Sequence, residues 1–256
     1  MPVIVNQISS PLNATQQEII AAALKKLGSA AKHAAECEIH KSSLDARKRN
    51  DIHFVHSVFV TLDDAALEKK LCEKNTSLTY VERSVYKPVI SSEKAEGRIV
   101  IAGFGPAGMF AGLALAEQGY RPIILERGGS IEKRTAAVQK FWLTGKLDTD
   151  CNVQFGEGGA GTFSDGKLTT RIKDPLCRYV LERFVDFGAP KEILTKAKPH
   201  IGTDNLRNIV TAIRNRIIEL GGEVRFDCAL TDLAISNGRV QTISAGGKDE
   251  KVSAVI

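Results

Sequence analysis

The first 90 residues alternate between the apolar spacing of strands and that of helices. Residues 53–61 are rich in β-branched and aromatic side chains, which predicts a central strand. Residues 19–27 carry apolar side chains at helical spacing, and Thr15 and Glu18 before them match a capping box that predicts where this helix begins. The other predicted elements are strands at 3–5, 37–40 and 78–89, a polar, basic connection over 41–51, and a helix capped by Asp63 and Asp64.

The resulting order, β-α-β-β-α-β, predicts a small α+β domain of the ferredoxin-like split-βαβ type over residues 1–95. A polar segment, residues 91–97, follows and marks the domain boundary. Strands that alternate with helices then predict an α/β domain of Rossmann type over residues 96–256. Its predicted elements are a strand at 98–102, a helix at 107–118, a strand at 122–125, helices near 174–187 and 204–220, a strand at 223–226 and a hairpin turned at Asn237-Gly238.

Charge and cysteine content narrow the class of protein. The chain has 256 residues, 43% hydrophobic and 25% charged, enough for one large or two modest domains. Its formal charge of +5 divides evenly (13 basic and 11 acidic residues up to residue 95, 22 and 19 beyond it), so no basic stripe for nucleic acid is indicated. Five widely spaced cysteines without a CxxC pair favour neither a disulfide framework nor a metal site. With no signal peptide and no run of 18 apolar residues, we expect a cytoplasmic protein outside the membrane.

A glycine-rich turn joins the strand at 98–102 to the helix after it. Gly103 suits a tight turn, Gly105 lets the backbone approach a pyrophosphate, and Gly108 lets the helix pack close to the strand. The N-terminus of that helix then stabilises phosphate charge. Glu126 ends the next strand, where a carboxylate accepts hydrogen bonds from ribose hydroxyls and repels a 2′-phosphate. The pattern predicts a bound dinucleotide with an unmodified adenosine ribose, and leaves FAD and NAD both open.

Resemblance to known flavoproteins favours FAD. The turn, with Pro106 and Ala107 between its glycines, and the following Leu125-Glu126-Arg127-Gly128 resemble the FAD fingerprint of glutathione-reductase-type flavoproteins. Residues 152–168 (NVQFGEGGAGTFSDGKL) and 198–204 (KPHIGTD) are similar to a family of uncharacterised bacterial FAD-dependent dehydrogenases. In that family a small α+β domain precedes the FAD domain. The resemblance covers essentially the whole chain and implies FAD, but no particular substrate.

Further cofactor residues are expected in the glycine-rich segment between Phe155 and Lys167. Its five glycines free backbone N–H groups to face a phosphate or a flavin ring, with a flexible surface loop as the alternative. Similarity to related flavoproteins places residues 158–162 beside the flavin and pyrophosphate, and an adenine contact after the strand at 223–226. Two arginines are phosphate candidates, a solvated charge being equally favoured for each. These cofactor candidates are Gly158, Gly159, Ala160, Gly161, Thr162, Leu230, Arg127 and Arg134.

Other chemistry-bearing side chains have a structural alternative. Cys151 is a candidate redox thiol and His200 a candidate proton donor, although structural roles are favoured for both. Asp165 and Lys167 are candidates for the flavin neighbourhood or ordinary loop charges. A basic cluster in the first domain indicates a solvated loop, with RNA or another acidic partner as the alternative. Its members are Lys41, Arg47, Lys48 and Arg49.

The last residues, 250–256, predict a strand that runs into the core. In the family resembled, this strand leads on to a further loop near FAD and to a substrate region, so we expect this chain to be incomplete. The function indicated is an FAD-dependent oxidoreductase that passes a hydride between a small-molecule substrate and flavin. NAD(P)H is a candidate electron donor or acceptor. The alternative is a nucleotide-responsive RNA- or protein-binding module.

Overall fold

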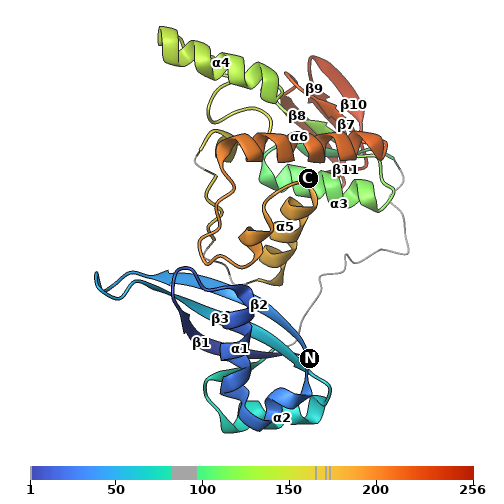
Figure 1. Ribbon diagram of the computed structural model, residues 1–256. Coiled ribbons are helices and arrows are strands. Elements are labelled where there is room, and N and C mark those ends of the chain that lie inside the picture. The colour runs from blue at the N-terminus through green and yellow to red at the C-terminus, as the bar shows by residue number, and fades with distance from the viewer. Residues whose placement is uncertain (1, 82–96, 165, 171, 173) are drawn as a thin grey trace. The chain divides into compact units, whose positions relative to one another are not determined.

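The computed structural model describes residues 2–81, 97–164, 166–170, 172 and 174–256 (Figure 1). They fall into two compact units. The first is larger than the predicted domain, because it takes in two segments from later in the chain. The predicted linker lies outside the described residues except for Gly97. Unit 1 spans Met1–Tyr86, Leu168–Val185 and Pro190–Pro199, and unit 2 spans Lys87–Lys167, Asp186–Ala189 and His200–Ile256.

Unit 1 is built on an antiparallel sheet of four strands in the order β2-β3-β1-β4. The predicted capping box is confirmed, since Thr15 and Glu18 cap each other's backbone at the start of α1, and Asp64 caps α2. Apolar side chains of β1, β3 and α1 form the core. In chain order the elements are β1 (Val3–Ser10), α1 (Gln16–Leu27), the 3₁₀ helix η1 (Gly28–His33), β2 (Ala34–Asp45), β3 (His53–Leu62), α2 (Ala65–Lys74) and β4 (Leu78–Tyr80).

Several predicted boundaries in unit 1 change. The strand expected at 3–5 extends to Ser10, and the strand expected at 37–40 begins at Ala34. The connection expected over 41–51 begins later, because β2 continues to pair with β3 from Lys41 opposite Ser57 to Asp45 opposite His53. Pairing with a neighbouring strand therefore overrides the polar composition of residues 41–45. The strand expected at 78–89 is described only as β4, and residues 82–89 lie outside the described part.

The later segments join unit 1 through β2, an edge strand of its sheet. Ser42 N–H donates to the carbonyl of Thr195 at 2.7 Å, and Ala197 N–H donates to the carbonyl of Ser42 at 2.9 Å. The 3₁₀ helix η3 (Lys191–Leu194) precedes these residues, and Arg178 of α5 (Pro175–Asp186) donates to the carbonyl of Leu194. Main-chain pairing to an edge strand thus explains why this part of the chain belongs to unit 1.

Unit 2 contains a parallel sheet in the order β11-β5-β6-β7. Numbered along the chain and read from the β7 edge, this order is 3-2-1-4, as in doubly wound nucleotide-binding sheets. The α/β class expected for this part of the chain is confirmed. The strands are β5 (Ile99–Ala102), β6 (Ile123–Leu125), β7 (Glu223–Arg225) and β11 (Ala254–Val255); the helices are α3 (Pro106–Glu117), α4 (Ile131–Thr144), η2 (Ala160–Phe163) and α6 (Thr203–Glu219); and β8 (Leu230–Ser236), β9 (Arg239–Ala245) and β10 (Lys248–Lys251) form an antiparallel meander.

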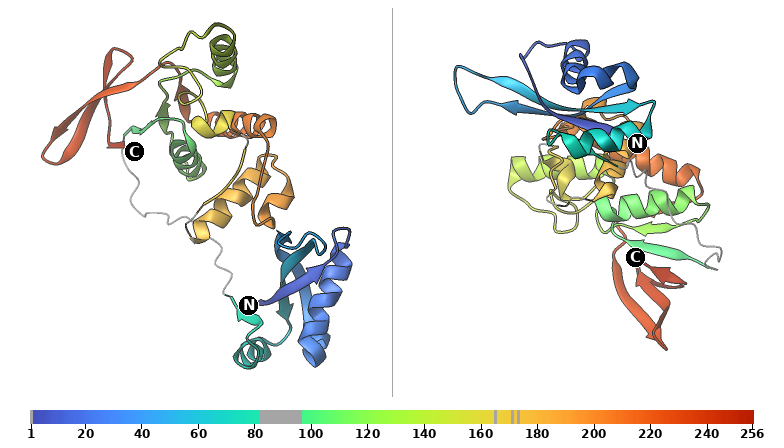
Figure 2. Two further views of the ribbon diagram at one scale, coloured as in Figure 1. Left: turned by 90° about the vertical axis from the view of Figure 1, so that its left-hand side faces the viewer. Right: turned by 90° about the horizontal axis from the view of Figure 1, so that it is seen from below.

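Alternate side chains of the parallel strands serve two faces of the sheet. Ile123 and Leu125 pack against the meander through Ile243. Ile124 points the other way, since a Cβ added to Gly112 of α3 would lie 2.5 Å from its Cδ1. Figures 1 and 2 show α3 and α6 side by side, and the meander of β8, β9 and β10 apart from these two helices. Burial on both faces explains why the central strands β5 and β6 are continuously apolar, whereas the edge strand β7 is not.

The strand expected over 250–256 is two strands in two sheets, so this prediction was wrong. β10 ends at Lys251 in its pairing with β9. Val252 is buried among residues of the parallel sheet and the meander, and Ser253 N–H donates to the carbonyl of Arg98. The chain then pairs with β5 as β11, with Ala254 beside Ile99. The chain thus passes from the meander to the parallel sheet within residues 250–256, which the sequence predicted as one strand.

We predict that Ile217→Ala lowers the free energy of unfolding of unit 2 by about 2–5 kcal/mol. Ile217 is fully buried on α6, and its truncation leaves a cavity. The adjacent Ile218 is 49% exposed, so Ile218→Ala should cost less than about 1 kcal/mol. Urea unfolding of the whole chain, together with hydrogen exchange of the α6 amides, measures the cost of each variant. Equal costs for the two variants would contradict the inward orientation of Ile217.

Candidate functional site

The Gly103–Gly108 turn joins β5 to α3. Gly103 has a φ of +99°, and its N–H donates to the carbonyl of Leu125 at 2.7 Å. A Cβ on Gly108 would lie 2.0 Å from the carbonyl oxygen of Gly103, so α3 approaches the turn this closely only with glycine there. A Cβ on Gly105 would meet nothing within 4 Å. Packing therefore requires glycine at position 108 but not at position 105.

The first turn of α3 presents unpaired backbone donors to solvent. Gly105 is the N-cap, and Pro106 and Ala107 are exposed. In the described part of the chain, the N–H groups of Ala107 and Gly108 donate no hydrogen bond. Free amides at the positive end of a helix dipole attract an anion.

A second glycine-rich segment, residues 156–163, lies against this turn. Gly158 N–H donates to the carbonyl of Phe104 at 2.8 Å. A Cβ on Gly159 would lie 3.2 Å from both the Cα of Gly105 and the Cδ of Pro106. Gly156, Gly158 and Gly159 have φ angles of +119°, +82° and +69°, which residues with side chains rarely adopt. The structure thus brings together the two glycine-rich segments that the sequence analysis selected.

This segment also presents unpaired amides. Ala160 and Gly161 are exposed, and their N–H groups donate no hydrogen bond within the described residues. Thr162 is fully buried, and its Oγ1 lies 3.5 Å from the carbonyl of Glu157. Backbone donors therefore dominate the exposed surface here, while the Thr162 side chain supports the segment from beneath.

Glu126 links the two glycine-rich segments. It ends β6 and is 5% exposed. Its Oε2 accepts from Phe104 N–H at 2.7 Å, and its Oε1 accepts from Gly128 N–H at 2.9 Å and from Gly156 N–H at 3.1 Å. A carboxylate offers about four acceptor positions, so about one remains for a ribose hydroxyl. The ribose contact stays a prediction, and the structure adds a bridging role that the sequence did not indicate.

Arg134 is not a solvated charge, so that alternative, one of the two left open for it, was wrong. It is fully buried on α4, and its guanidinium lies 4.7 Å from the centre of the Phe163 ring. The guanidinium donates to four backbone carbonyls, which leaves few donors for the phosphate contact considered above. Arg134 instead holds residues 152–157, which precede the free amides of Ala160 and Gly161. The accepting carbonyls belong to Asn152 (2.8 Å), Val153 (2.7 Å), Gly156 (3.4 Å) and Glu157 (2.7 Å).

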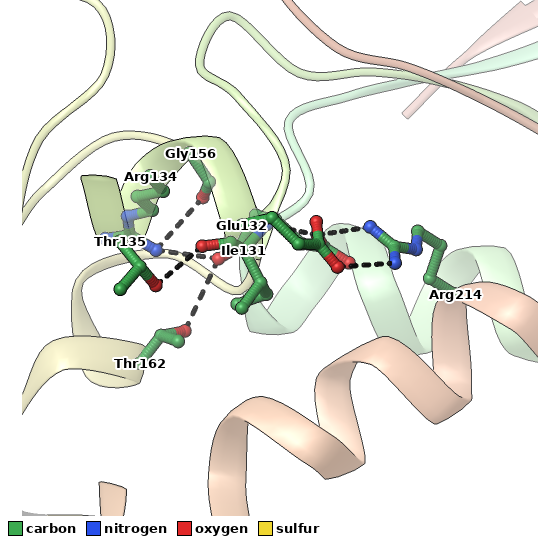
Figure 3. Close-up of polar contacts among 8 residues, drawn as sticks. Ile131, Glu132, Arg134, Thr135, Gly156, Thr162 and Arg214 are labelled. Carbon is green, nitrogen blue, oxygen red and sulfur yellow. Dashed lines mark hydrogen bonds and ion pairs between the residues drawn. The ribbon is translucent and has the colours of Figure 1, made fainter. Parts of the chain in front are cut away.

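Glu157, which the sequence did not indicate as a site residue, connects the second glycine-rich segment to α4 and α6. It is fully buried, and its Oε2 accepts from Ile131 N–H of α4 at 2.7 Å and from Arg214 Nη1 of α6 at 2.8 Å. Figure 3 shows Arg214 pointing from α6 toward Glu132 of α4, which it contacts at 3.3 Å. Burial raises the pKa of Glu157, and the Ile131 amide and Arg214 oppose that rise. Within the described residues its buried Oε1 has no hydrogen-bond partner.

Arg127 and Leu230 differ in exposure. Arg127 is exposed, with its guanidinium 4.3 Å from the centre of the Phe155 ring, so it remains free to contact an anion. Leu230 is half-buried and packs against the core between the parallel sheet and the meander. Its contact with adenine stays a prediction.

The weaker candidates lie in different surroundings. Cys151 is 3% exposed and not in a disulfide, which favours a structural thiol over a redox thiol. His200 is exposed, and its backbone pairs with that of Lys167 in an isolated bridge. Asp165 lies outside the described residues. No catalytic role follows for any of them.

The basic cluster of unit 1 is balanced by acidic side chains. Arg47 donates to both carboxylate oxygens of Asp45, and these hydrogen bonds lower the pKa of Asp45 to about 2. Lys41 belongs to β2 rather than to the loop. A cavity near the loop mixes acidic and basic side chains, and such a surface lacks the concentrated positive charge that phosphate backbones require. Its lining residues are Asp45, Arg47, Lys48, Asp51 and His53.

A domain of unknown function (DUF8436) matches residues 1–61. An uncharacterized protein of Clostridium beijerinckii is 42% identical over 250 residues, which make up 97% of this chain and 46% of that protein. The chain therefore spans about half the length of this curated relative.

Several solved structures are similar over part of the chain, at lower identity. Thermovibrio ammonificans THI4 is 19% identical with a TM-score of 0.37, over 62% of this chain and 55% of that chain. Glycine oxidase from Bacillus cereus is 12% identical with a TM-score of 0.41, over 62% and 56%. The 3-ketosteroid-delta4-(5alpha)-dehydrogenase from Rhodococcus jostii is 17% identical with a TM-score of 0.40, over 65% and 46%. With TM-scores below 0.5, these likenesses assign no site residue to this chain.

The described residues contain neither a candidate membrane-spanning helix nor a candidate metal site. No described helix combines the length and the hydropathy needed to cross a bilayer. Likewise, the described His, Cys, Asp and Glu side chains form no group of three or more suited to a metal ion.

We predict that Gly158→Ala lowers the free energy of unfolding of unit 2 by about 1–3 kcal/mol. Its Cβ would lie 2.2 Å from Thr162 Oγ1, at a φ of +82°. Gly161→Ala is the matched control, because a Cβ there would meet nothing within 4 Å, and we expect a change of less than about 0.5 kcal/mol. Thermal unfolding of the ligand-free chain compares them, and a tolerated Gly158→Ala would mean that the segment is not packed as described.

Proposed function

We propose that unit 2 binds FAD and that the chain is part of a flavin-dependent oxidoreductase. One observation carries the proposal: the 156–163 segment lies against the first turn of α3, so that unpaired amides of both face solvent from adjacent backbone. Two such sets of donors suit the two phosphates of a dinucleotide better than a single anion.

The glycine positions support this fit. Gly105 stands between the two sets of amides, and the space where a Cβ would project is open. Because packing alone would accept a side chain at this position, its absence is explained by a ligand that needs the space. Glu126 keeps about one acceptor position for a ribose hydroxyl, and its negative charge disfavours a 2′-phosphate.

The choice of FAD over NAD depends on the sequence resemblance and on the second glycine-rich segment beside the first. When bound, FAD supplies hydride-transfer chemistry, and the role of this chain's residues is to bind and orient it. The substrate is proposed to be a small molecule. Since the chain spans about half of its relative, the reaction of the whole protein belongs to the proposal as well.

Unit 1 is proposed to be a ferredoxin-like domain attached to the flavin unit. Its element order β1-α1-β2-β3-α2-β4 and its sheet order β2-β3-β1-β4 support this interpretation, because β3 lies between β1 and β2 as a split βαβ unit requires.

We predict that the purified chain binds FAD and that Gly105→Val weakens binding by about 100-fold or more, a loss of about 3 kcal/mol. The branched side chain would fill the open space at the first turn of α3, where nothing else lies within 4 Å, so the ligand-free fold should persist. Absorption spectra after gel filtration with FAD, and titration by flavin fluorescence, measure binding. Gly105→Ala, with a smaller side chain, should show an intermediate loss.

Circular dichroism of ligand-free Gly105→Val is the control for folding. Retention of NAD or FMN in place of FAD by the wild-type chain would refute the cofactor assignment. Unchanged affinity for FAD in a folded Gly105→Val chain would show that no phosphate approaches this turn.

A further inference from the structure

Arg134 is a buried cation that has no carboxylate partner among the described residues. No carboxylate of the described residues lies within ion-pair distance of its fully buried side chain. Burial lowers the pKa of Arg134 to about 10, an effect that nearby Glu126, Cys151 and Glu157 oppose, so the guanidinium is charged near neutral pH. Burying such a charge is costly unless its donors are engaged. Its position therefore calls for an explanation beyond general stability.

The four carbonyls that engage Arg134 all belong to one short segment, residues 152–157. Within it, Asn152 Oδ1 accepts from the N–H groups of Gln154 and Phe155, which closes a tight turn. The N–H groups of Asn152, Gln154 and Phe155 are thus satisfied within the turn, while four carbonyls of residues 152–157 accept from one side chain. Arg134 acts as the centre around which residues 152–157 are wrapped.

This wrapped segment leads directly into the proposed cofactor contacts. Gly156 is held on both sides, because its N–H donates to Glu126 and its carbonyl accepts from Arg134, as Figure 3 shows for the second contact. A Cβ on Gly156 would lie 2.6 Å from Arg134 Cδ. Two residues later, Gly158 N–H reaches the carbonyl of Phe104 in the glycine-rich turn. A shift of residues 152–157 would therefore be passed on to the free amides at Ala160 and Gly161.

We propose that Arg134 is a positioning residue for the cofactor site. By binding the carbonyls of residues 152–157, it fixes the following segment so that the amides of Ala160 and Gly161 face the phosphates together with those of α3. Arg134 does not touch the cofactor itself in this proposal. The proposal depends on the proposed function for the identity of the ligand, but its effect on the segment can be measured without any ligand.

Arg207 provides a matched control. Its guanidinium also stacks on Phe163, at 4.6 Å from the ring centre compared with 4.7 Å for Arg134. Among the described residues it donates to no carbonyl of 152–157, and its ion pair with Asp204 is long, at 3.9 Å. Removing Arg207 therefore removes a cation and an aromatic contact from the same ring, but none of the carbonyl contacts.

The test compares Arg134→Ala, Arg134→Lys and Arg207→Ala in the full chain, by hydrogen exchange without ligand and by FAD titration. Arg134→Ala should raise exchange of residues 156–163 by about tenfold or more and weaken FAD binding by about 100-fold. Arg134→Lys has three donors instead of five, so its exchange rates and FAD affinity should lie between those of Arg134→Ala and the wild type. Arg207→Ala should stay within about threefold of the wild type in both measurements.

Chemical rescue separates positioning from a loss of fold. Guanidinium ion at about 10 mM should restore both exchange protection and FAD affinity in Arg134→Ala, because it supplies the missing donors without the tether. Unchanged exchange in Arg134→Ala, or an equal loss in Arg207→Ala, would overturn the proposal. So would a failure of both guanidinium and Arg134→Lys to recover any affinity. If the wild-type chain binds no FAD, the proposed function fails, and the exchange data alone decide whether Arg134 fixes the segment.

Discussion

The buried carboxylate of Glu126 holds together the backbone that forms the candidate site. It accepts hydrogen bonds from the turn after β5, from the residue two positions beyond itself, and from the start of the second glycine-rich segment. A buried carboxylate is tolerated only where donors surround it, so these three segments must converge for Glu126 to be buried at all. The free amides of α3 and of residues 160–161 are brought near each other by this convergence.

Arg134 and Glu157 form a second group of buried charges, which holds residues 152–157 in place. Arg134 binds carbonyls of these residues, and Glu157 connects them to the start of α4 and to Arg214 of α6. Glu157 also caps α4 from a distant part of the chain, since Ser130, the N-cap residue, makes no side-chain cap. Such a network costs desolvation and fixes geometry, and fixed geometry is what a backbone-lined phosphate site requires.

The glycines of unit 2 divide by physical role. At Gly108 and Gly128 an added Cβ would meet backbone atoms of a neighbouring segment, so these glycines allow close packing. At Gly105 and Gly161 an added Cβ would meet nothing, so packing does not account for them. The proposed binding surface of main-chain donors would account for both groups, because its segments must approach each other closely and also leave space for a ligand.

The sequence by itself determined the elements whose signals are local. The capping box of Thr15 and Glu18, the cap at Asp64, the turn at Gly103–Gly108 and the helix α6 were all predicted, because each depends on side-chain spacing within a few residues. Tertiary structure alone decided what depends on distant partners. It divided residues 250–256 between two sheets, attached residues 195–197 to β2, and buried Arg134 and Glu157 beneath the second glycine-rich segment. An arginine at the centre of a buried turn and an arginine in water have the same local sequence signal. Only the position of the accepting carbonyls distinguishes them.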